Sequence, residues 1–543
     1  MRKTALLLLL IIFSLACEKK VDLVVHNARV YTSDDNYTNI SSFVVDKGRF
    51  IEVGGEELVE KYKSINTVNA RGLPVFPGFI DSHCHLLSLG LKKFEVDLKG
   101  TKSFEEIIDK LKDYSSNKKL SVIRGAGWDQ NDWDKKELPN KNVLDILFPN
   151  IPVVLTRIDG HAMLVNQQAL DMAGITIETK SEGGEIVKHD GKLTGVIIDR
   201  PMELIERIIP KYTRDEKIKA LKSAEKICFE HGITTVDEAG LIKSDILLID
   251  SLHKSKLFDL RVYAMVANDK KSLDYFFKNG PIRKDFLNVS SIKVYADGAL
   301  GSRGAALKKS YTDKKNHYGS IIISLDSIKK LAIRALNNGF QMNTHAIGDY
   351  ANSEVLKIYN DILSSTSDPR WRIEHAQVIS DDDFPNFNEK IIPSVQPLHA
   401  TSDMYWAEER LGKSRVKGAY AYKDLLDWSG RLALGTDFPV EDVNPIKTFY
   451  AAVSRKDLNQ YPAGGYQSEN ALSRREALLG MTIWGAYANF EENLKGSITP
   501  GKYADFVILD RDIMEIETHR IPSARVVATI LNGEIVYSTR FDN

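Results

Sequence analysis

The sequence predicts an α/β fold, a (β/α)8 barrel of the TIM type, and three observations support this prediction. Short apolar runs with the length and composition of buried parallel strands recur along the chain. Helix-like stretches, such as residues 327–338, fall between these runs. Several runs end in a polar side chain, and the chemistry of such barrels gathers at the carboxyl ends of the strands.

The predicted barrel strands follow one another in chain order. Strand one is the apolar run that ends in the two histidines His83 and His85. Strands two to eight are predicted at residues 234–238, 260–266, 292–296, 341–345, 371–375, 391–396 and 432–437.

Strand one ends in a His-x-His pair formed by His83 and His85. Residues i and i+2 of an extended chain share one face, so the two imidazoles are spaced to hold one metal ion. Two residues cannot complete the four ligands of a usual zinc site, and a polar strand end explains the pair equally well. The metal interpretation therefore depends on further ligands.

Residues that can bind or bridge metal ions occur in four other strands. They are Lys293 in strand four, His345 at the end of strand five, His375 at the end of strand six and Asp437 at the end of strand eight. Taken singly, they fit a lysine that extends to solvent, hydrogen-bonded histidines and an aspartate that caps a turn. Their joint occurrence at ordered strand ends favours one shared metal site.

This set of motifs resembles the amidohydrolase superfamily, and more narrowly its amidohydrolase-3 branch, which includes N-substituted formamide deformylases. The resemblance covers nearly the whole chain after the amino-terminal leader. The motifs that carry it are residues 77–81 before the histidines and residues 293–303, 344–349, 373–376 and 434–439.

The resemblance implies a centre of two divalent ions, with zinc as the expected metal. The implied ligands are His83, His85, Lys293, His345, His375 and Asp437. The His-x-His pair and the aspartate would hold the more buried ion, and the two later histidines the second. The lysine would bridge both ions after N6-carboxylation by carbon dioxide, because an ammonium group cannot coordinate a cation.

The resemblance implies hydrolysis of a carbon–nitrogen bond in an amide, a formamide or a related compound. Bound metal lowers the pKa of water, and the resulting hydroxide attacks a carbonyl that the metal polarises. Asp437 is the predicted catalytic residue, which takes the proton and returns it to the leaving nitrogen. Cys84 is a poor nucleophile candidate, because strand alternation directs it away from the two histidines.

Three more residues are predicted to contact substrate. His161 follows the apolar run 153–156, in a segment that resembles one entering the active site in this branch. A structural turn explains the same segment equally well. Gln396 and His399 lie at the end of strand seven, where the aromatic residues beyond them line a pocket or pack a loop.

The segments outside the barrel define the remaining domain plan. Strand-like runs at both chain ends predict one composite β-sandwich, from residues 21–74 and 495–543, beside a barrel spanning 75–494. Roughly 150 residues separate strands one and two, too many for a loop in a compact domain. Most of this stretch, residues 95–230, is predicted to be an inserted subdomain that covers the barrel mouth and sets substrate selectivity.

The amino terminus predicts export. A short positive region and an apolar stretch too short to span a membrane indicate a signal peptide at residues 1–16. Cys17 then resembles the lipidated first residue of a lipoprotein, although Ser14 departs from the usual aliphatic residue. The expected location is the bacterial cell envelope, with membrane attachment only through the lipid on Cys17.

Composition limits the partners and the fold classes. The formal net charge of -1 provides no basic field for nucleic acid, so the expected partner is a small-molecule substrate, and a homodimer stays open. If Cys17 is lipidated, only two cysteines remain, which argues against a disulfide framework.

Two alternatives stay open beside the binuclear hydrolase. One is a mononuclear deaminase-type enzyme that uses His83, His85, His345 and Asp437 with an unmodified Lys293. The other is a non-catalytic binding lipoprotein on the same fold. The lysine favours two ions over one, and six filled ligand positions favour catalysis over binding alone.

Overall fold

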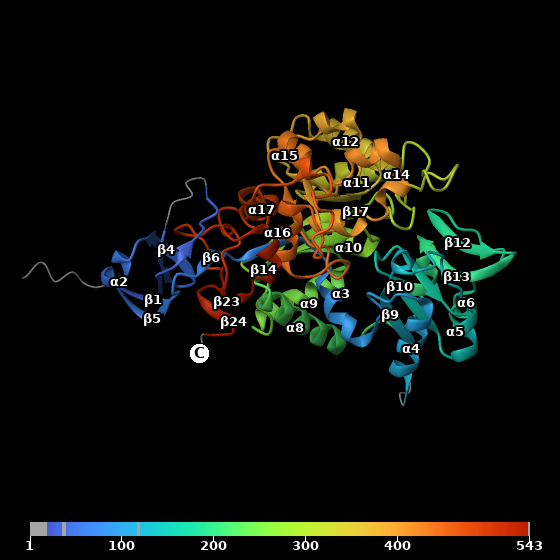
Figure 1. Ribbon diagram of the computed structural model, residues 1–543, viewed down its shortest axis with the longest axis horizontal. Helices are drawn as coiled ribbons and strands as arrows, with labels where there is room; N and C mark the ends of the chain where they lie inside the picture. The colour runs from blue at the N-terminus through green and yellow to red at the C-terminus, as the bar shows by residue number, and fades with distance from the viewer. Residues whose placement is uncertain (1–18, 35–39, 117–119, 541–543) are drawn as a thin grey trace, which may run out of the picture.

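The computed structural model describes residues 19–34, 40–116 and 120–540. The predicted signal peptide and Cys17 lie outside the described residues, so export and lipidation stay predictions. Along the long axis, a β-rich body of the chain termini, a central barrel and a separate subdomain follow one another (Figure 1). Within the described ranges, no helix is both long and apolar enough to cross a bilayer.

The central body contains eight parallel strands in one sheet, which confirms the predicted barrel. In chain order they are β7 (Phe79–Cys84), β14 (Ile233–Leu241), β15 (Arg261–Ala267), β17 (Leu287–Tyr295), β18 (Gln341–Ala346), β19 (Trp371–His375), β20 (Ile391–Val395) and β21 (Ala433–Leu434). Each strand pairs in parallel with the next along the chain. The short β16 (Ile282–Arg283) pairs antiparallel with β17.

The two ends of this sheet, β7 and β21, are joined by hydrogen bonds of nearby residues. The amide of Asp437 donates to the carbonyl oxygen of His83 at 2.8 Å. The Asp81 carboxylate accepts from the hydroxyl of Thr436 at 2.6 Å and from its amide at 3.0 Å. These bonds bring the first and last strands of the barrel together, and with them their predicted metal ligands.

Strand eight is shorter than predicted. The strand is Ala433–Leu434 rather than residues 432–437. The chain leaves it at Gly435, where a Cβ atom would lie 2.5 Å from the amide nitrogen of His83. Asp437 then adopts a left-handed backbone with φ 59°, which is incompatible with a strand. Asp437 therefore follows the strand instead of ending it.

The limits of strands one and four also differ from the prediction. His85 lies one residue beyond β7 and precedes α3 (Leu86–Leu91). Strand four begins at Leu287, earlier than predicted. The prediction missed its first residues because polar side chains interrupt the apolar pattern there. These residues are buried: Ser290 donates to Asn288 at 2.6 Å, and the Asn288 amide donates to a backbone carbonyl at 3.0 Å.

Helices cover the outside of the barrel. After β14, β15, β17 and β18 come α9 (Lys243–Lys254), α10 (Lys270–Asn279), α11 (Leu325–Asn337) and α12 (Asp349–Leu363). After β20 and β21 come α13 (Pro397–Asp403), α14 (Ala407–Arg415), α15 (Tyr422–Ser429), α16 (Pro445–Ser454), α17 (Arg474–Gly480) and α18 (Ile483–Ala488). Their apolar faces join the strands in one large hydrophobic cluster.

Both ends of the chain contribute to the β-rich body. One sheet contains β1 (Lys19–His26), β3 (Ser42–Asp46), β4 (Arg49–Gly54) and β5 (Tyr62–Asn69), with α2 (Glu57–Lys61) beside it. The second contains β2 (Arg29–Val30), β6 (Pro74–Pro77), β22 (Phe506–Leu509), β23 (Val526–Leu531) and β24 (Glu534–Ser538). A shared hydrophobic cluster joins the sheets, and the rings of Phe43 and Phe506 meet edge to face at 4.9 Å.

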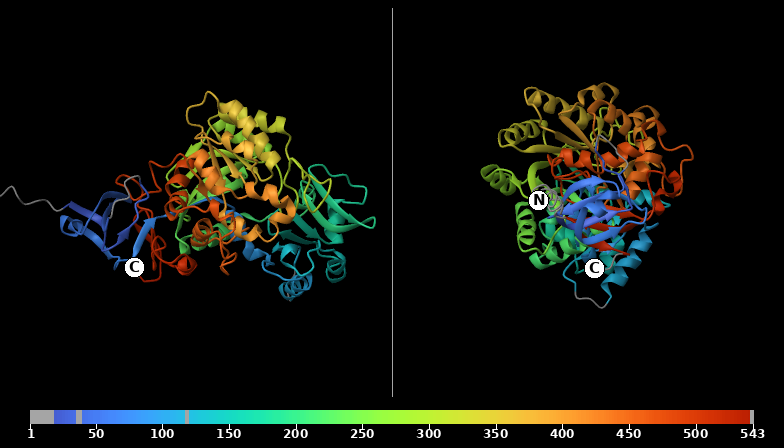
Figure 2. Two further views of the ribbon diagram at one scale, coloured as in Figure 1. Left: turned by 45° about the horizontal axis from the view of Figure 1, so that its top comes forward. Right: turned by 90° about the vertical axis from the view of Figure 1, so that its left-hand side faces the viewer.

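The insertion after β7 forms its own sheet at the opposite end of the molecule from β1–β5 (Figure 2). Its strands are β8 (Val96–Asp97), β9 (Ile123–Trp128), β10 (Val153–Arg157), β11 (Ala162–Val165), β12 (Gly184–His189) and β13 (Lys192–Asp199). Its helices are α4 (Phe104–Ser115), α5 (Asn142–Leu147), α6 (Gln167–Ala173) and α7 (Met202–Glu206). Two hydrophobic clusters of its own stabilise this subdomain.

Helix α8 (Arg214–Glu230) falls within the predicted insertion range of 95–230 but packs on the barrel. Its residues Ala224 and Cys228 belong to the same hydrophobic cluster as Phe79 of β7. The helix therefore acts as the barrel helix that precedes β14, and the separate sheet of the insertion ends before it.

Candidate metal centre

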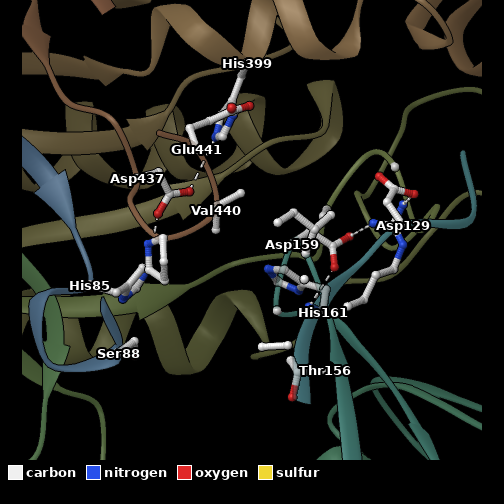
Figure 3. Close-up of a pocket in the computed structure, with 18 of the residues that line it drawn as sticks. His85, Ser88, Asp129, Thr156, Asp159, His161, His399, Asp437, Val440 and Glu441 are labelled. Atoms are coloured by element: carbon white, nitrogen blue, oxygen red, sulfur yellow. Dashed lines mark hydrogen bonds and ion pairs between the residues drawn. The ribbon is translucent and has the colours of Figure 1, made fainter. Parts of the chain in front are cut away.

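The carboxyl ends of the barrel strands surround one cavity of about 670 Å³. All the predicted ligands line it, namely His83, His85, Lys293, His345, His375 and Asp437. His399 and Asp437 lie on the barrel side of the cavity, and His161 lies on the insertion side (Figure 3). Gln396 is outside the set of described residues that line the cavity, because its side chain turns back and donates to the carbonyl of Ser394 at 3.2 Å.

His83 is held in one orientation. Its Nδ1 forms a short hydrogen bond with the Glu374 carboxylate, which can only accept when ionised, so Nδ1 carries the hydrogen. The other nitrogen, Nε2, lies 3.2 Å from Nζ of Lys293 and 3.7 Å from Oδ1 of Asp437. A carboxylate behind a histidine fixes the tautomer that presents a lone pair to a metal.

Glu374 belongs to a buried ionic network below the cavity. The guanidinium of Arg372 pairs with Asp237 at 2.7 Å and donates to the Ser394 hydroxyl at 2.8 Å. Although burial opposes ionisation, Arg372 and His83 hold the pKa of Glu374 far below its usual value. The sequence carries a signal for this network, since Arg372 and Glu374 share one face of an otherwise apolar strand.

His345 and His375 lie side by side, with ring centroids 4.5 Å apart. The His375 ring is also 4.9 Å from that of His83. Burial, reinforced by neighbouring imidazoles, holds the pKa of both later histidines well below the usual value. Both are therefore neutral near pH 7, which is the form that binds metal.

Backbone strain marks two of the predicted ligands. His375 has φ 72° and Asp437 has φ 59°, both in the left-handed region. Such conformations cost about 1–3 kcal/mol each in non-glycine residues and cluster at functional sites. The fold maintains both at the cavity, where they place an imidazole and a carboxylate.

The donor atoms of this site fit divalent metal. His345 Nε2 and His375 Nδ1 are buried and make no hydrogen bond within the part of the chain that the structure describes, and the buried Oδ1 of Asp437 lies 3.3 Å from Nε2 of His85. Each unsatisfied buried polar group costs about 1–3 kcal/mol, so the two imidazole nitrogens indicate a ligand that meets them. Ligand atoms of His83, His375 and Asp437 lie within 4.8 Å of one another. The group places His375 beside His83 and Asp437, although the resemblance assigns His375 to the second ion and the other two residues to the more buried one.

Lys293 is buried between the candidate ligands. Burial is the main cause that lowers the pKa of its amine to about 8, although Glu374 and Asp437 oppose the shift. Its Nζ also lies 4.9 Å from the ring centroid of Tyr295. A pKa near neutrality makes the free amine accessible, and only the free amine can react with carbon dioxide.

His399 connects two carboxylates on the barrel side. Its Nε2 lies 3.4 Å from Oδ2 of Asp437, and its Nδ1 lies 3.2 Å from Oε1 of Glu441. Although burial opposes the charged form, these two partners raise the pKa of His399 to about 10. Glu441 also accepts from the Ser402 hydroxyl at 2.5 Å. Sequence reasoning misses Glu441, because no strand pattern distinguishes it in its loop.

The insertion supplies the opposite wall. The His161 ring centroid is 5.3 Å from that of His345, and its Nδ1 lies 2.8 Å from Oδ1 of Asp199. Burial opposes protonation of His161, but the hydrogen bond to Asp199 and the charges of the nearby carboxylates together raise the pKa. Arg157 lies farther along the wall and pairs with Asp129 and Asp159. Sequence reasoning misses Asp199, which is distant from His161 in the chain.

Comparisons with known proteins agree with this geometry. Residues 66–537 match the model of the amidohydrolase family. The chain is 34% identical to protein LONG AFTER FAR-RED 3 of Arabidopsis thaliana, covering 95% of this chain and 91% of that one. It is 30% identical to YtcJ of Bacillus subtilis, named as an amidohydrolase (94% and 98% covered), and 24% identical to N-substituted formamide deformylase of Arthrobacter pascens (95% and 98% covered).

A solved structure also resembles the whole molecule. An uncharacterized metal-dependent hydrolase from Pyrococcus horikoshii superposes with a TM-score of 0.75 at 28% identity, covering 91% of this chain and 99% of that one. The similarity therefore extends over the terminal body, the barrel and the insertion rather than over the barrel alone.

Proposed function

The chain belongs to the amidohydrolase family, and on that premise we propose that it hydrolyses an amide, formamide or related carbon–nitrogen bond at a centre of two divalent ions, with zinc as the expected metal. The observation that carries the proposal is the buried cluster of ligand atoms at His83, His375 and Asp437, beside imidazole nitrogens of His345 and His375 that make no hydrogen bond among the described residues.

The buried charges at the barrel mouth support the presence of cations. Three carboxylates, Asp237, Glu374 and Asp437, face the guanidinium of Arg372 and the amine of Lys293. Carboxylation of Lys293 would replace a positive charge by a negative one. Buried charges must be paired, so divalent ions would offset the resulting excess of negative charge.

The residues of the chain have separate tasks in this proposal. Bound metal would activate a water molecule and polarise the substrate carbonyl. Asp437 Oδ1 faces the centre, where it can take a proton from that water and return it to the leaving nitrogen. His399 lies 3.4 Å from the other oxygen, Oδ2, and so helps to keep Oδ1 directed at the substrate.

Substrate contacts are proposed on both sides of the cavity, from His399 on the barrel and His161 on the insertion. A cavity of about 670 Å³ has the size of a small-molecule site. Its walls also include the apolar side chains of Leu300 and Trp406. We place the selectivity for the acyl or amine group in the insertion, because the barrel side is occupied by the reacting groups.

A mononuclear, deaminase-type enzyme is the second candidate. The observation that favours it is the compact group of His83, His375 and Asp437, whose ligand atoms lie within 4.8 Å as for a single ion. Lys293 favours two ions, because an unmodified ammonium group 3.2 Å from His83 Nε2 would repel a cation there.

Metal analysis and a substrate panel test the proposal together. After metal-replete purification, two ions per chain are expected, and one ion or none would contradict the binuclear centre. A panel of N-formyl and N-acyl amines is expected to contain hydrolysed compounds. Density for a carboxylated amine on Lys293 in a crystal structure would support the bridge, and an unmodified amine between two bound ions would contradict it.

Location and partners remain separate proposals. We propose export to the cell envelope with a lipid on Cys17 as the only membrane attachment, a small-molecule substrate as the partner and no binding of nucleic acid. Labelling of the cells with a radioactive fatty acid should mark the wild-type protein and leave a Cys17→Ser variant unlabelled. Labelling of both forms would contradict the anchor.

A further inference from the structure

The barrel segment that follows Lys293 contains a notch made by two glycines. A Cβ atom on Gly298 would lie 2.9 Å from both carboxylate oxygens of Asp199, and one on Gly304 would lie 2.7 Å from Oδ2. Cβ atoms essentially never approach so closely, so only glycine leaves room for this carboxylate. The notch is therefore shaped for a side chain of the insertion.

The shape of the notch is fixed from the barrel side. Asp297 precedes Gly298, and its carboxylate accepts three backbone N–H groups, from Ala306 and Gly348 at 2.8 Å and from Ile347 at 3.0 Å. These bonds tie the segment to the loop that follows β18. A carboxylate with three amide donors is held rigidly, which keeps the neighbouring glycines in place.

Asp199 is equally well fixed on the insertion side. It is the last residue of β13, its side chain is 2% exposed, and its backbone has a left-handed φ of 56°. Its amide donates to the carbonyl of His161 at 2.9 Å. The same pair is joined a second time through Oδ1 of Asp199 and Nδ1 of His161 at 2.8 Å.

This second bond determines which imidazole nitrogen reaches the cavity. Because a carboxylate accepts hydrogen bonds, Nδ1 of His161 carries the hydrogen, whether the ring is neutral or charged. Nε2 is then the nitrogen left for the cavity into which His161 projects (Figure 3). The ring centroid of His161 lies 5.3 Å from that of His345.

We propose that Asp199 is a positioning residue, which seats the insertion in the Gly298–Gly304 notch of the barrel and aims Nε2 of His161 at the substrate. The second half of this statement rests on the proposed function, because it requires a substrate at the metal centre. A neighbouring contact supports the first half: a Cβ atom on Gly301 would lie 3.5 Å from Nη1 of Arg157, also from the insertion. One barrel segment thus meets the insertion at two points.

A matched pair of variants tests the proposal on the metal-loaded enzyme. Asp199 and Asp190 lie on the same β12–β13 hairpin, both with positive φ, which asparagine tolerates as aspartate does. We expect Asp199→Asn to lower kcat/KM about 10–100-fold, mostly through kcat, with two ions per chain retained. The exposed Asp190→Asn should behave as the wild type. A stability loss without any change in kcat or KM would overturn the positioning role.

A glycine variant and an NMR measurement keep the test independent of hydrolysis. Gly304→Ala leaves Asp199 and His161 in the sequence but displaces the carboxylate, so it should reproduce the effect of Asp199→Asn. In the zinc-loaded protein labelled with 15N-histidine, the His161 signal, assigned by difference with His161→Gln, should report hydrogen on Nδ1. Asp199→Asn and Gly304→Ala should shift it towards a mixture of tautomers.

The outcomes separate the two proposals. If the wild type hydrolyses nothing in the panel, the proposed function fails, and the NMR result alone decides the role of Asp199. If the His161 signal and the kinetics are both unchanged in Gly304→Ala, the notch does not position His161 and the inference is wrong.

Discussion

The floor of the cavity and its insertion wall differ in how they are built. The floor consists of charged side chains from two barrel strands, Asp237 of β14 and Arg372 and Glu374 of β19, which are 0% exposed and in which Arg372 pairs with both carboxylates. Glu374 in turn holds His83 by a hydrogen bond. The floor therefore orients the candidate ligand His83 through contacts that water does not reach.

The wall is built from ion pairs that stay in contact with the cavity. Arg157 is buried, but its partners Asp129 and Asp159 are 18% and 15% exposed. Polar groups at such positions can exchange protein partners for a ligand. The difference is consistent with the proposal that the barrel carries the reacting groups and that the insertion sets substrate selectivity.

The largest expected effect is a loss of hydrolysis in a variant whose insertion wall is unchanged. Asp437→Asn should lower kcat by about 10²–10⁴-fold because proton transfer is lost, with the circular dichroism spectrum unchanged. Asp442→Asn, in the same loop but outside the set of described residues that line the cavity, should retain activity. Full activity of the Asp437 variant would contradict its proton-transfer role.

The floor and the wall should differ in stability. Arg372→Met leaves two fully buried carboxylates without their cation and should lower the free energy of unfolding by about 3–5 kcal/mol. Arg157→Met should cost less, about 1–3 kcal/mol, because water can reach its partners. Urea unfolding of the metal-loaded proteins measures both losses, and equal losses would remove the distinction between floor and wall.

Metal affinity tests how the floor acts on the centre. Glu374→Gln should weaken metal binding about 10–100-fold in competition with a chelator, because the tautomer of His83 is no longer fixed. Asp383→Asn provides the control, since this buried carboxylate follows the same strand but pairs with Lys308 at 2.6 Å. Equal affinities of the Glu374 variant and the control would show that the floor does not act on the metal.

The smallest expected effect is on the pH dependence of stability. It concerns Asp403, a carboxylate of the cavity whose hydrogen-bond partners are neutral. Tyr420 donates to it at 2.7 Å, and burial raises its pKa to about 7. The folded protein keeps this proton up to about pH 7, while the unfolded chain releases it near pH 4. The contribution of protonated Asp403 to the stability of the folded protein is therefore fully present below about pH 4 and is lost as pH rises towards 7.

Replacing the group should remove this part of the pH dependence. Asp403→Asn should make the free energy of unfolding depend less on pH between about 4 and 7 than in the wild type. Urea unfolding at several pH values measures it. An unchanged pH dependence would mean that Asp403 is solvated in the folded protein.

The sequence is sufficient to predict the barrel and the candidate ligands, because both follow local rules. Lys293, His345 and His375 lie within or at the ends of apolar strands, where parallel packing brings them to one side of the barrel. Asp437 also lines the cavity as predicted, but it does so from beyond its strand, on a left-handed backbone, rather than from the strand end.

Residues that act through distant contacts could not be predicted. Asp199 becomes important only because the β12–β13 hairpin returns it to His161 and to the notch in the barrel. In the sequence, nothing distinguishes Glu441 from the other acidic residues of its loop. Its contact with His399 is visible only in the folded structure. Gln396 shows the opposite case, because a strand-end position did not direct its side chain into the cavity.

The meeting of the two chain ends in one sheet has a consequence for the order of assembly. The C-terminal β22 pairs with β6, which leads through Gly78 directly into β7 and its histidine. The strand that leads into the first barrel strand thus receives its neighbour from a much later part of the chain. We expect chains that stop before β22 to leave β6 exposed and the ligands of β7 unanchored, so that only full-length molecules can retain metal.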